Sequence, residues 1–158
     1  MKKDLLRLIY QRRFKLMNRW NAGAMAYQPK FGGVSDIAFR SFIFNAFEKL
    51  TQALRQEEKE GEAPGTSLLE QFDFPKAPDL IAYREILEAG IAVLDAFIAE
   101  DPACTDRFSK AVREEVRRSL KEAGASFMEV EARAYKKQFL SDRPGSVTCI
   151  HCGRPLAE

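Results

Sequence analysis

Apolar residues recur every three or four positions along most of the chain, the spacing that places them on one face of an α-helix. This pattern covers residues 3–20, 37–54, 80–98 and 106–139. No segment shows the alternation of apolar and polar residues that is typical of a half-buried strand. The pattern therefore predicts an all-α protein with four main helices.

Polar residues just before these stretches predict where the helices begin. A Ser, Thr or Asp at an N-cap accepts a hydrogen bond from an otherwise free N–H group of the first turn. The predicted N-caps are Ser35 with Asp36, Ser67 in a capping box with Glu70, Asp79, and Thr105. The capping box predicts a short additional helix. Gly124 is a predicted weak point of the last helix, since glycine lowers helix stability.

Length and composition fit one folded domain followed by a tail. The chain has 158 residues, of which 46% are hydrophobic and 30% charged, as is usual for globular proteins. We predict a single helical domain over residues 1–143, either a helical bundle or a globin-like fold, with one or two short helices besides the four main ones. Residues 144–158 are predicted to form an irregular, cysteine-containing tail.

Sequence features that would place the protein in or across a membrane are missing. No stretch approaches the ~18–20 consecutive apolar residues of a membrane span. Charges interrupt the apolar core that a signal peptide would need at the N-terminus. Three cysteines, an odd number, do not form a disulfide framework of the secreted type. We expect a cytoplasmic protein.

Charge is nearly balanced over the whole chain but uneven along it. With 25 Lys and Arg against 23 Asp and Glu, the formal net charge is +2, which disfavours nucleic acid or a membrane surface as the partner. The first predicted helix is nevertheless basic, and it could bind an anionic partner through Arg7, Arg12, Arg13, Lys15 and Arg19. In the alternative interpretation, this basic face is only solvated while the apolar face packs in the core.

The segment "TCIHCG" near the C-terminus pairs Cys149 and Cys152 with the spacing and following glycine of a zinc knuckle. A structural zinc ion needs four ligands, so these cysteines, with His151 as a weaker candidate, supply only part of the set. The others could come from a second subunit, from a partner protein, or from Cys104 together with His151. A redox dithiol and a tail without metal are the alternatives.

The helical body lacks the residues that many enzyme mechanisms need. His151 is the only histidine, so the body has no Ser-His or Cys-His pair, no haem ligand of the globin type and no Glu-x-x-His of a di-iron site. A c-type haem site would need His directly after Cys152, where Gly153 stands. The remaining candidates are carboxylates expected on solvated helix faces: Glu114, Glu115, Glu129 and Glu131. We expect neither catalysis nor haem.

Aromatic residues crowd onto the second predicted helix, at Phe39, Phe42, Phe44 and Phe47. They could form the core, line an apolar ligand cavity, or be covered partly by a second subunit. The last possibility would agree with a zinc ion shared between two chains, and it predicts a homodimer. A larger protein partner is the other assembly that the cysteine tail suggests.

The order of the segments resembles the helical N-terminal domain of RsbT co-antagonist proteins of the RsbR type. The resemblance lies in "LLRLIYQRRFKLMNRW", with its tryptophan near the end, in "DLIAYREILEAGIAVLDAFI" and in "VRRSLKEAGASFMEVEARAYKKQF". It spans about residues 4–140. It implies a non-haem globin-like dimer that acts as a sensory or regulatory module and passes a signal to a partner.

These features together predict a non-enzymatic regulatory or adaptor protein that acts through protein–protein contacts, with a CxxC tail that binds zinc across subunits. One alternative is an accessory subunit of a redox or metal-handling complex that docks through the same tail. A further alternative is a nucleic-acid or membrane-surface binder that uses the basic first helix.

Overall fold

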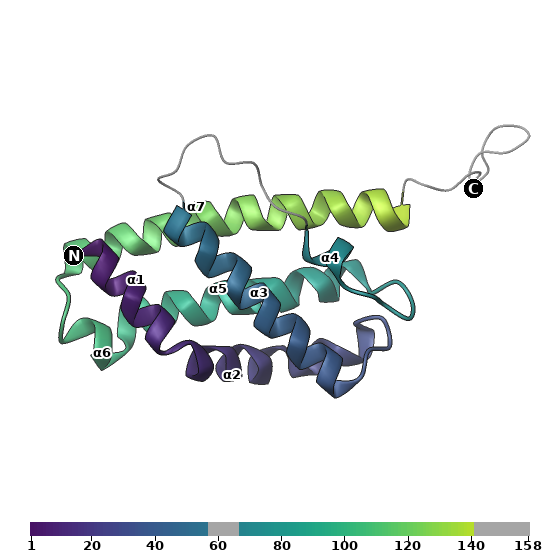
Figure 1. Ribbon diagram of the computed structural model, residues 1–158, viewed down its shortest axis with the longest axis horizontal. Helices are drawn as coiled ribbons and strands as arrows, with labels where there is room; N and C mark the ends of the chain where they lie inside the picture. Colours follow the sequence, from purple (N-terminus) through teal and green to yellow (C-terminus); the bar gives the residue numbers. More distant parts are fainter. Residues whose placement is uncertain (57–66, 141–158) are drawn as a thin grey trace, which may run out of the picture.

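The computed structural model describes residues 1–56 and 67–140, and within these ranges every regular element is a helix (Figure 1). The long helices are α1 (Lys2–Gln11), α2 (Arg13–Ala24), α3 (Asp36–Gln56), α5 (Leu80–Glu100) and α7 (Lys110–Tyr135). The short elements are α4 (Leu68–Gln71), α6 (Pro102–Thr105), the 3₁₀ turn η1 (Met25–Lys30) and the π-helical turn η2 (Lys136–Leu140). The predicted all-α class is confirmed.

The predicted helix over residues 3–20 is wrong in one respect, because the chain forms two helices that meet at Arg12. The backbone there leaves helical geometry, with φ −100° and ψ 17°. The buried apolar residues are Leu5, Leu8 and Ile9 on α1 and Leu16, Met17, Trp20 and Ala24 on α2. In a single continuous helix, Arg12 would occupy the next position of this buried apolar face. The break leaves Arg12 exposed while α1 packs on α7 and α2 on α5.

Three of the predicted helix starts are confirmed by side-chain hydrogen bonds. The backbone N–H groups of Ala38, Glu70 and Ala82 donate to Ser35 Oγ at 3.1 Å, Ser67 Oγ at 3.1 Å and Asp79 Oδ2 at 3.0 Å, respectively. These contacts satisfy N–H groups that the first turn of a helix leaves free. The short helix α4 that follows Ser67 is the one the capping box predicts.

The predicted start of the last helix at Thr105 is wrong. Thr105 ends α6, a single turn that Asp101 caps and that has Pro102 in its first position. The cap of α7 is Ser109, whose Oγ accepts a hydrogen bond from the Val112 N–H at 3.2 Å. This extra turn places Cys104 in the core, and Phe108, just after the turn, is buried as well.

The core lies around α5, which packs against α2 on one side and α7 on the other, with α3 crossing the same region (Figure 1). Trp20 of α2 is fully buried, and its Nε1 donates to the Ile86 carbonyl oxygen at 2.8 Å. Its ring lies directly against Gly90, where an added Cβ would be 2.3 Å from the indole. The absence of a side chain at Gly90 therefore sets how closely α2 approaches α5.

The helix α7 continues unbroken through Gly124, the predicted weak point. The Ile91 side chain of α5 fills the space beside Gly124, and a Cβ at Gly124 would lie 2.9 Å from Ile91 Cδ1. The glycine thus serves close packing between α5 and α7.

The aromatic residues of α3 belong mainly to the core of this one chain. Phe39, Phe42 and Phe47 are at most 1% exposed, and Phe44 is half-buried. At the centre of their cluster lies Phe31, with its ring centroid 4.8 Å from that of Phe42. Covering these rings does not require a second subunit, so the homodimer stays a prediction without support from this cluster.

The chain reaches Phe31 through a turn that only glycine adopts easily. Gly32 and Gly33 have φ angles of 80° and 76°. The Gly32 carbonyl accepts a hydrogen bond from the Lys76 N–H at 3.2 Å, and a Cβ on Gly32 would lie 2.5 Å from the Lys76 carbonyl oxygen. The turn thereby joins the segments before α3 and before α5, and both close over the aromatic cluster.

Candidate functional site

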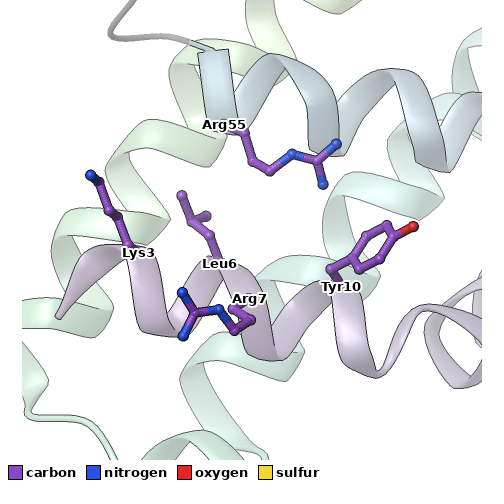
Figure 2. Close-up of a pocket in the computed structure, with 5 residues that line it drawn as sticks. All are labelled: Lys3, Leu6, Arg7, Tyr10 and Arg55. Carbon is purple, nitrogen blue, oxygen red and sulfur yellow. The ribbon is translucent and has the colours of Figure 1, made fainter.

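A groove with a basic rim lies between α1 and the C-terminal end of α3. Its lining residues are Lys3, Leu6, Arg7, Tyr10 and Arg55, and it encloses about 380 Å³. Figure 2 shows the first four along α1 and Arg55 reaching across from α3. Lys3, Arg7 and Arg55 are exposed and Leu6 is partly buried, so the groove combines cations at the rim with an apolar patch.

The helical repeat explains why these residues share a face. Positions 3, 6, 7 and 10 are three or four apart, so they lie on one side of α1, next to the buried stripe of Leu5, Leu8 and Ile9. Arg55 stands in the last turn of α3, where a cation interacts favourably with the helix dipole. The contact between α1 and α3 brings these two sets of side chains together.

A second hollow of about 300 Å³ extends the groove toward the start of α7. The residues lining it are Met1, Lys2, Lys3, Leu6, Leu54, Arg55 and Glu115. Lys3, Leu6 and Arg55 thus border both hollows, so the basic surface is continuous. Acidic groups stand at its margins, since Asp4 pairs with Arg7 at 3.4 Å and Glu115 lies at the far end.

Beside the groove, arginine and aromatic side chains stack across three helices. The guanidinium carbon of Arg13 lies 4.1 Å from the ring centroid of Tyr10 and 4.7 Å from that of Phe14. That of Arg55 lies 5.4 Å from the Tyr10 ring. Arg13 also donates from Nη1 to the Tyr10 carbonyl oxygen at 3.0 Å. We call Tyr10, Arg13, Phe14 and Arg55 the cation–π stack.

The five basic residues predicted to bind an anionic partner do not form one surface. They are Arg7, Arg12, Arg13, Lys15 and Arg19. Arg7 lines the groove and Arg13 belongs to the stack. Arg19 pairs with Asp101 at 3.9 Å, and Arg12 lies close enough to Cys104 to influence the pKa of that thiol. Both therefore face the α6 side, while Lys15 is exposed on α2. The break at Arg12 causes this division, because it turns α2 away from the direction of α1.

Two groove cations were missed as site residues. Lys3 lies within the basic N-terminal run and shares the helical spacing of Arg7, so periodicity could have added it. No local signal could have identified Arg55, because it is 48 positions from Arg7 and reaches the groove only through packing of α3 on α1.

The predicted zinc ligands Cys149, His151 and Cys152 lie outside the described residues, so the zinc site stays a prediction. Within residues 1–56 and 67–140, no group of three His, Cys, Asp or Glu residues could hold a metal ion. Cys104 is fully buried, and burial raises its pKa to about 11. It is therefore a protonated thiol at neutral pH, and it could join the tail ligands only if α6 opened.

One predicted surface carboxylate, Glu131, is in fact buried and only 1% exposed. Its carboxyl oxygens accept hydrogen bonds from the Leu68 N–H at 2.8 Å, the Leu69 N–H at 3.2 Å and the Tyr83 hydroxyl at 2.5 Å. It thus ties α4 and α5 to α7. Glu129, in contrast, is exposed as expected and pairs with Arg133.

The buried Cys104 thiol and Tyr83 hydroxyl should make the protein less stable in alkali. Burial raises the pKa of Cys104 to about 11, and burial together with the nearby Glu131 raises the pKa of Tyr83. Because both groups ionise more readily in the unfolded chain, the free energy of unfolding should fall as pH rises from 9.0 toward about 11. Urea denaturation at about pH 8 and about pH 10.5 measures this fall.

The matched variant for this test is Cys104→Ala, which removes the thiol proton. Its stability should fall less steeply with pH than that of the unmodified protein, whatever its stability at about pH 8. Equal slopes for the two proteins would contradict the role of Cys104.

Comparisons with family models, with curated proteins and with solved structures find no match to this chain. No helix in the part of the chain that the structure describes is long and apolar enough to cross a membrane. The function proposed below therefore rests on the geometry and charge of the groove.

Proposed function

We propose that the protein is a non-enzymatic regulatory or adaptor protein that binds an acidic segment of a partner protein in the groove between α1 and α3. The observation that carries the proposal is the meeting of Lys3, Arg7 and Arg55 from two helices around a patch formed by Leu6 and Tyr10. Carboxylates of a partner segment pair with the cations, while one of its apolar side chains covers Leu6.

The charges around the groove favour a short acidic segment over a continuous polyanion. Asp4 and Glu115 stand at the margins of the basic surface, where they repel a nucleic-acid backbone or a sheet of lipid phosphates. A peptide can place its few carboxylates between these points. The partly buried Leu6 at the bottom of a concave groove also suits an inserted side chain better than a flat membrane surface.

Two groups that can serve catalysis in other proteins, the Cys104 thiol and the Glu131 carboxylate, are buried in the core here. The Cys104 thiol is buried and protonated. Glu131 accepts three hydrogen bonds, two of them from the backbone of α4. A general base or nucleophile must instead be within reach of a substrate. These environments support a binding role.

The resemblance to RsbR-type N-terminal domains supports the same class of function, because such domains are regulatory modules without catalysis. We propose the corresponding architecture, a helical bundle of the non-haem globin-like type. The packing of α2 and α7 on opposite sides of α5 agrees with this proposal.

The experiment uses a fluorescent synthetic peptide of alternating Glu and Leu residues and measures its binding by fluorescence polarisation. Replacing Arg7 and Arg55 together by Glu should weaken binding by at least about tenfold, because the partner's carboxylates then face like charges. Binding of the unmodified protein should also weaken as salt rises, since the contacts are exposed.

The matched control replaces Arg40 and Arg84 by Glu. Both arginines are exposed and neither lines the groove. Because two arginines become Glu in each double variant, the change in net charge is the same as for Arg7 and Arg55. The control variant should bind the peptide within about threefold of the unmodified protein. Equal losses in the two double variants would show attraction by net charge alone and would contradict a specific groove.

A further inference from the structure

The cation–π stack holds Arg13 at the edge of the groove before any ligand arrives, and Arg55 contacts the same stack. Arg13 is held by its hydrogen bond to the Tyr10 carbonyl and by the rings of Tyr10 and Phe14. Arg55 lies over the Tyr10 ring from the side of α3. A long exposed side chain normally loses considerable rotamer freedom when it binds. This loss is smaller for an arginine that is already held in place, as Arg13 is.

The same stack leaves a large apolar surface open. Phe14 is 60% exposed and Tyr10 39% exposed. An exposed phenylalanine beside an ordered guanidinium offers an apolar face and a set of N–H donors at one place. Arg13 uses Nη1 for the Tyr10 carbonyl, so its other N–H groups can still bind the two oxygens of a carboxylate.

We infer that the stack selects the partner segment, which must carry a large apolar residue next to its acidic residues. The inference rests on the proposed function of the groove and names the partner more closely. A carboxylate of the segment forms paired hydrogen bonds with Arg13, and the adjacent apolar side chain packs on the exposed ring of Phe14. Further carboxylates meet Arg55 and Lys3 along the groove.

The chemistry of this site distinguishes the ligand from simpler anions. Inorganic phosphate or a chain of glutamates satisfies the cations but leaves the ring of Phe14 in water. An apolar chain without acids covers the ring but leaves the arginines unpaired. Only a segment with both features uses the two properties that the stack brings together.

The test compares two fluorescent peptides of equal charge, one of alternating Glu and Leu and one of alternating Glu and Ser. The unmodified protein should bind the leucine peptide about tenfold more tightly, the gain expected for covering one large apolar side chain. Phe14→Ser should reduce this preference at least about threefold, and the part of the preference that comes from Leu6 in the groove should remain. Circular dichroism checks that this variant, altered at an exposed position, remains folded.

Arg13→Lys tests the planar contact, because it keeps the charge but loses the paired donors. It should weaken binding of the leucine peptide about fivefold, whereas Arg40→Lys, an exposed control on α3, should leave binding unchanged. Equal affinities of the two peptides for the unmodified protein would overturn the inference. So would Arg13→Lys binding as tightly as the unmodified protein.

The same binding measurements distinguish failure of the proposed function from failure of the inference about the cation–π stack. If the proposed function fails, neither peptide binds, or binding survives the replacement of Arg7 and Arg55 by Glu. If the unmodified protein binds vesicles of anionic phospholipid or a single-stranded oligonucleotide more tightly than the leucine peptide, a protein segment is not the partner and the inference is overturned with it.

Discussion

Replacing Gly90 by alanine is expected to lower the free energy of unfolding by about 1–3 kcal/mol, although alanine is the better helix former. The new Cβ would lie 2.3 Å from the Trp20 indole. Trp20 cannot move aside easily, because it is fully buried and its Nε1 is bonded to the Ile86 carbonyl at 2.8 Å. Either α2 must shift from α5 or the hydrogen bond must lengthen. Urea denaturation followed by circular dichroism measures the change.

Gly23→Ala is the matched control for this substitution. Gly23 lies in α2, and an added Cβ there would meet no atom within 4 Å. This variant should keep its stability or gain up to about 1 kcal/mol, since alanine restricts the unfolded chain more than glycine does. If Gly90→Ala proves as stable as Gly23→Ala, the close approach of α2 to α5 is not as described.

Replacing Glu131 by alanine is expected to lower the free energy of unfolding by about 2–5 kcal/mol. The change leaves the Leu68 and Leu69 N–H groups and the Tyr83 hydroxyl without their buried acceptor. Unsatisfied buried donors are costly because the unfolded chain bonds them to water. Hydrogen exchange should show that the amides of α4 lose protection first, since Glu131 attaches α4 to α7.

Two further variants separate this role from a general effect of charge. Glu129→Ala removes an exposed carboxylate from the same helix and should change stability by no more than about 0.5 kcal/mol. Tyr83→Phe should be less destabilising in the Glu131→Ala background than in the unmodified protein, because the hydroxyl has then already lost this partner. Strictly additive effects of Tyr83→Phe and Glu131→Ala would contradict the shared hydrogen bond.

Local signals predicted most of the helices, because caps and apolar periodicity act within a few residues of the chain. Ser35, Ser67 and Asp79 each accept the hydrogen bond that their position suggests. The sequence-based prediction failed where contacts between distant segments determine the structure. The break at Arg12 depends on α1 and α2 having different neighbours, and the central place of Phe31 depends on a glycine turn that closes onto the residues before α5.

The candidate site was only partly predictable for the same reason. The basic character of the first helix is visible in the sequence, and Arg7 lines the groove. Arg55 comes from another helix, and the division of Arg12 and Arg19 from Arg7 follows from the break between α1 and α2. Glu131 was misjudged because periodicity does not reveal which polar position faces backbone N–H groups of a distant segment.

The most direct measurement of the central claim is a nuclear magnetic resonance titration of the ¹⁵N-labelled protein with the Glu and Leu peptide. Saturable shifts should be confined to the amides of α1, the first turn of α2 and the last turns of α3, with the side-chain signals of Arg13 and Arg55 among those that move most. Shifts centred on any other surface, or no saturable shifts, would contradict the assignment of the groove as the partner-binding site.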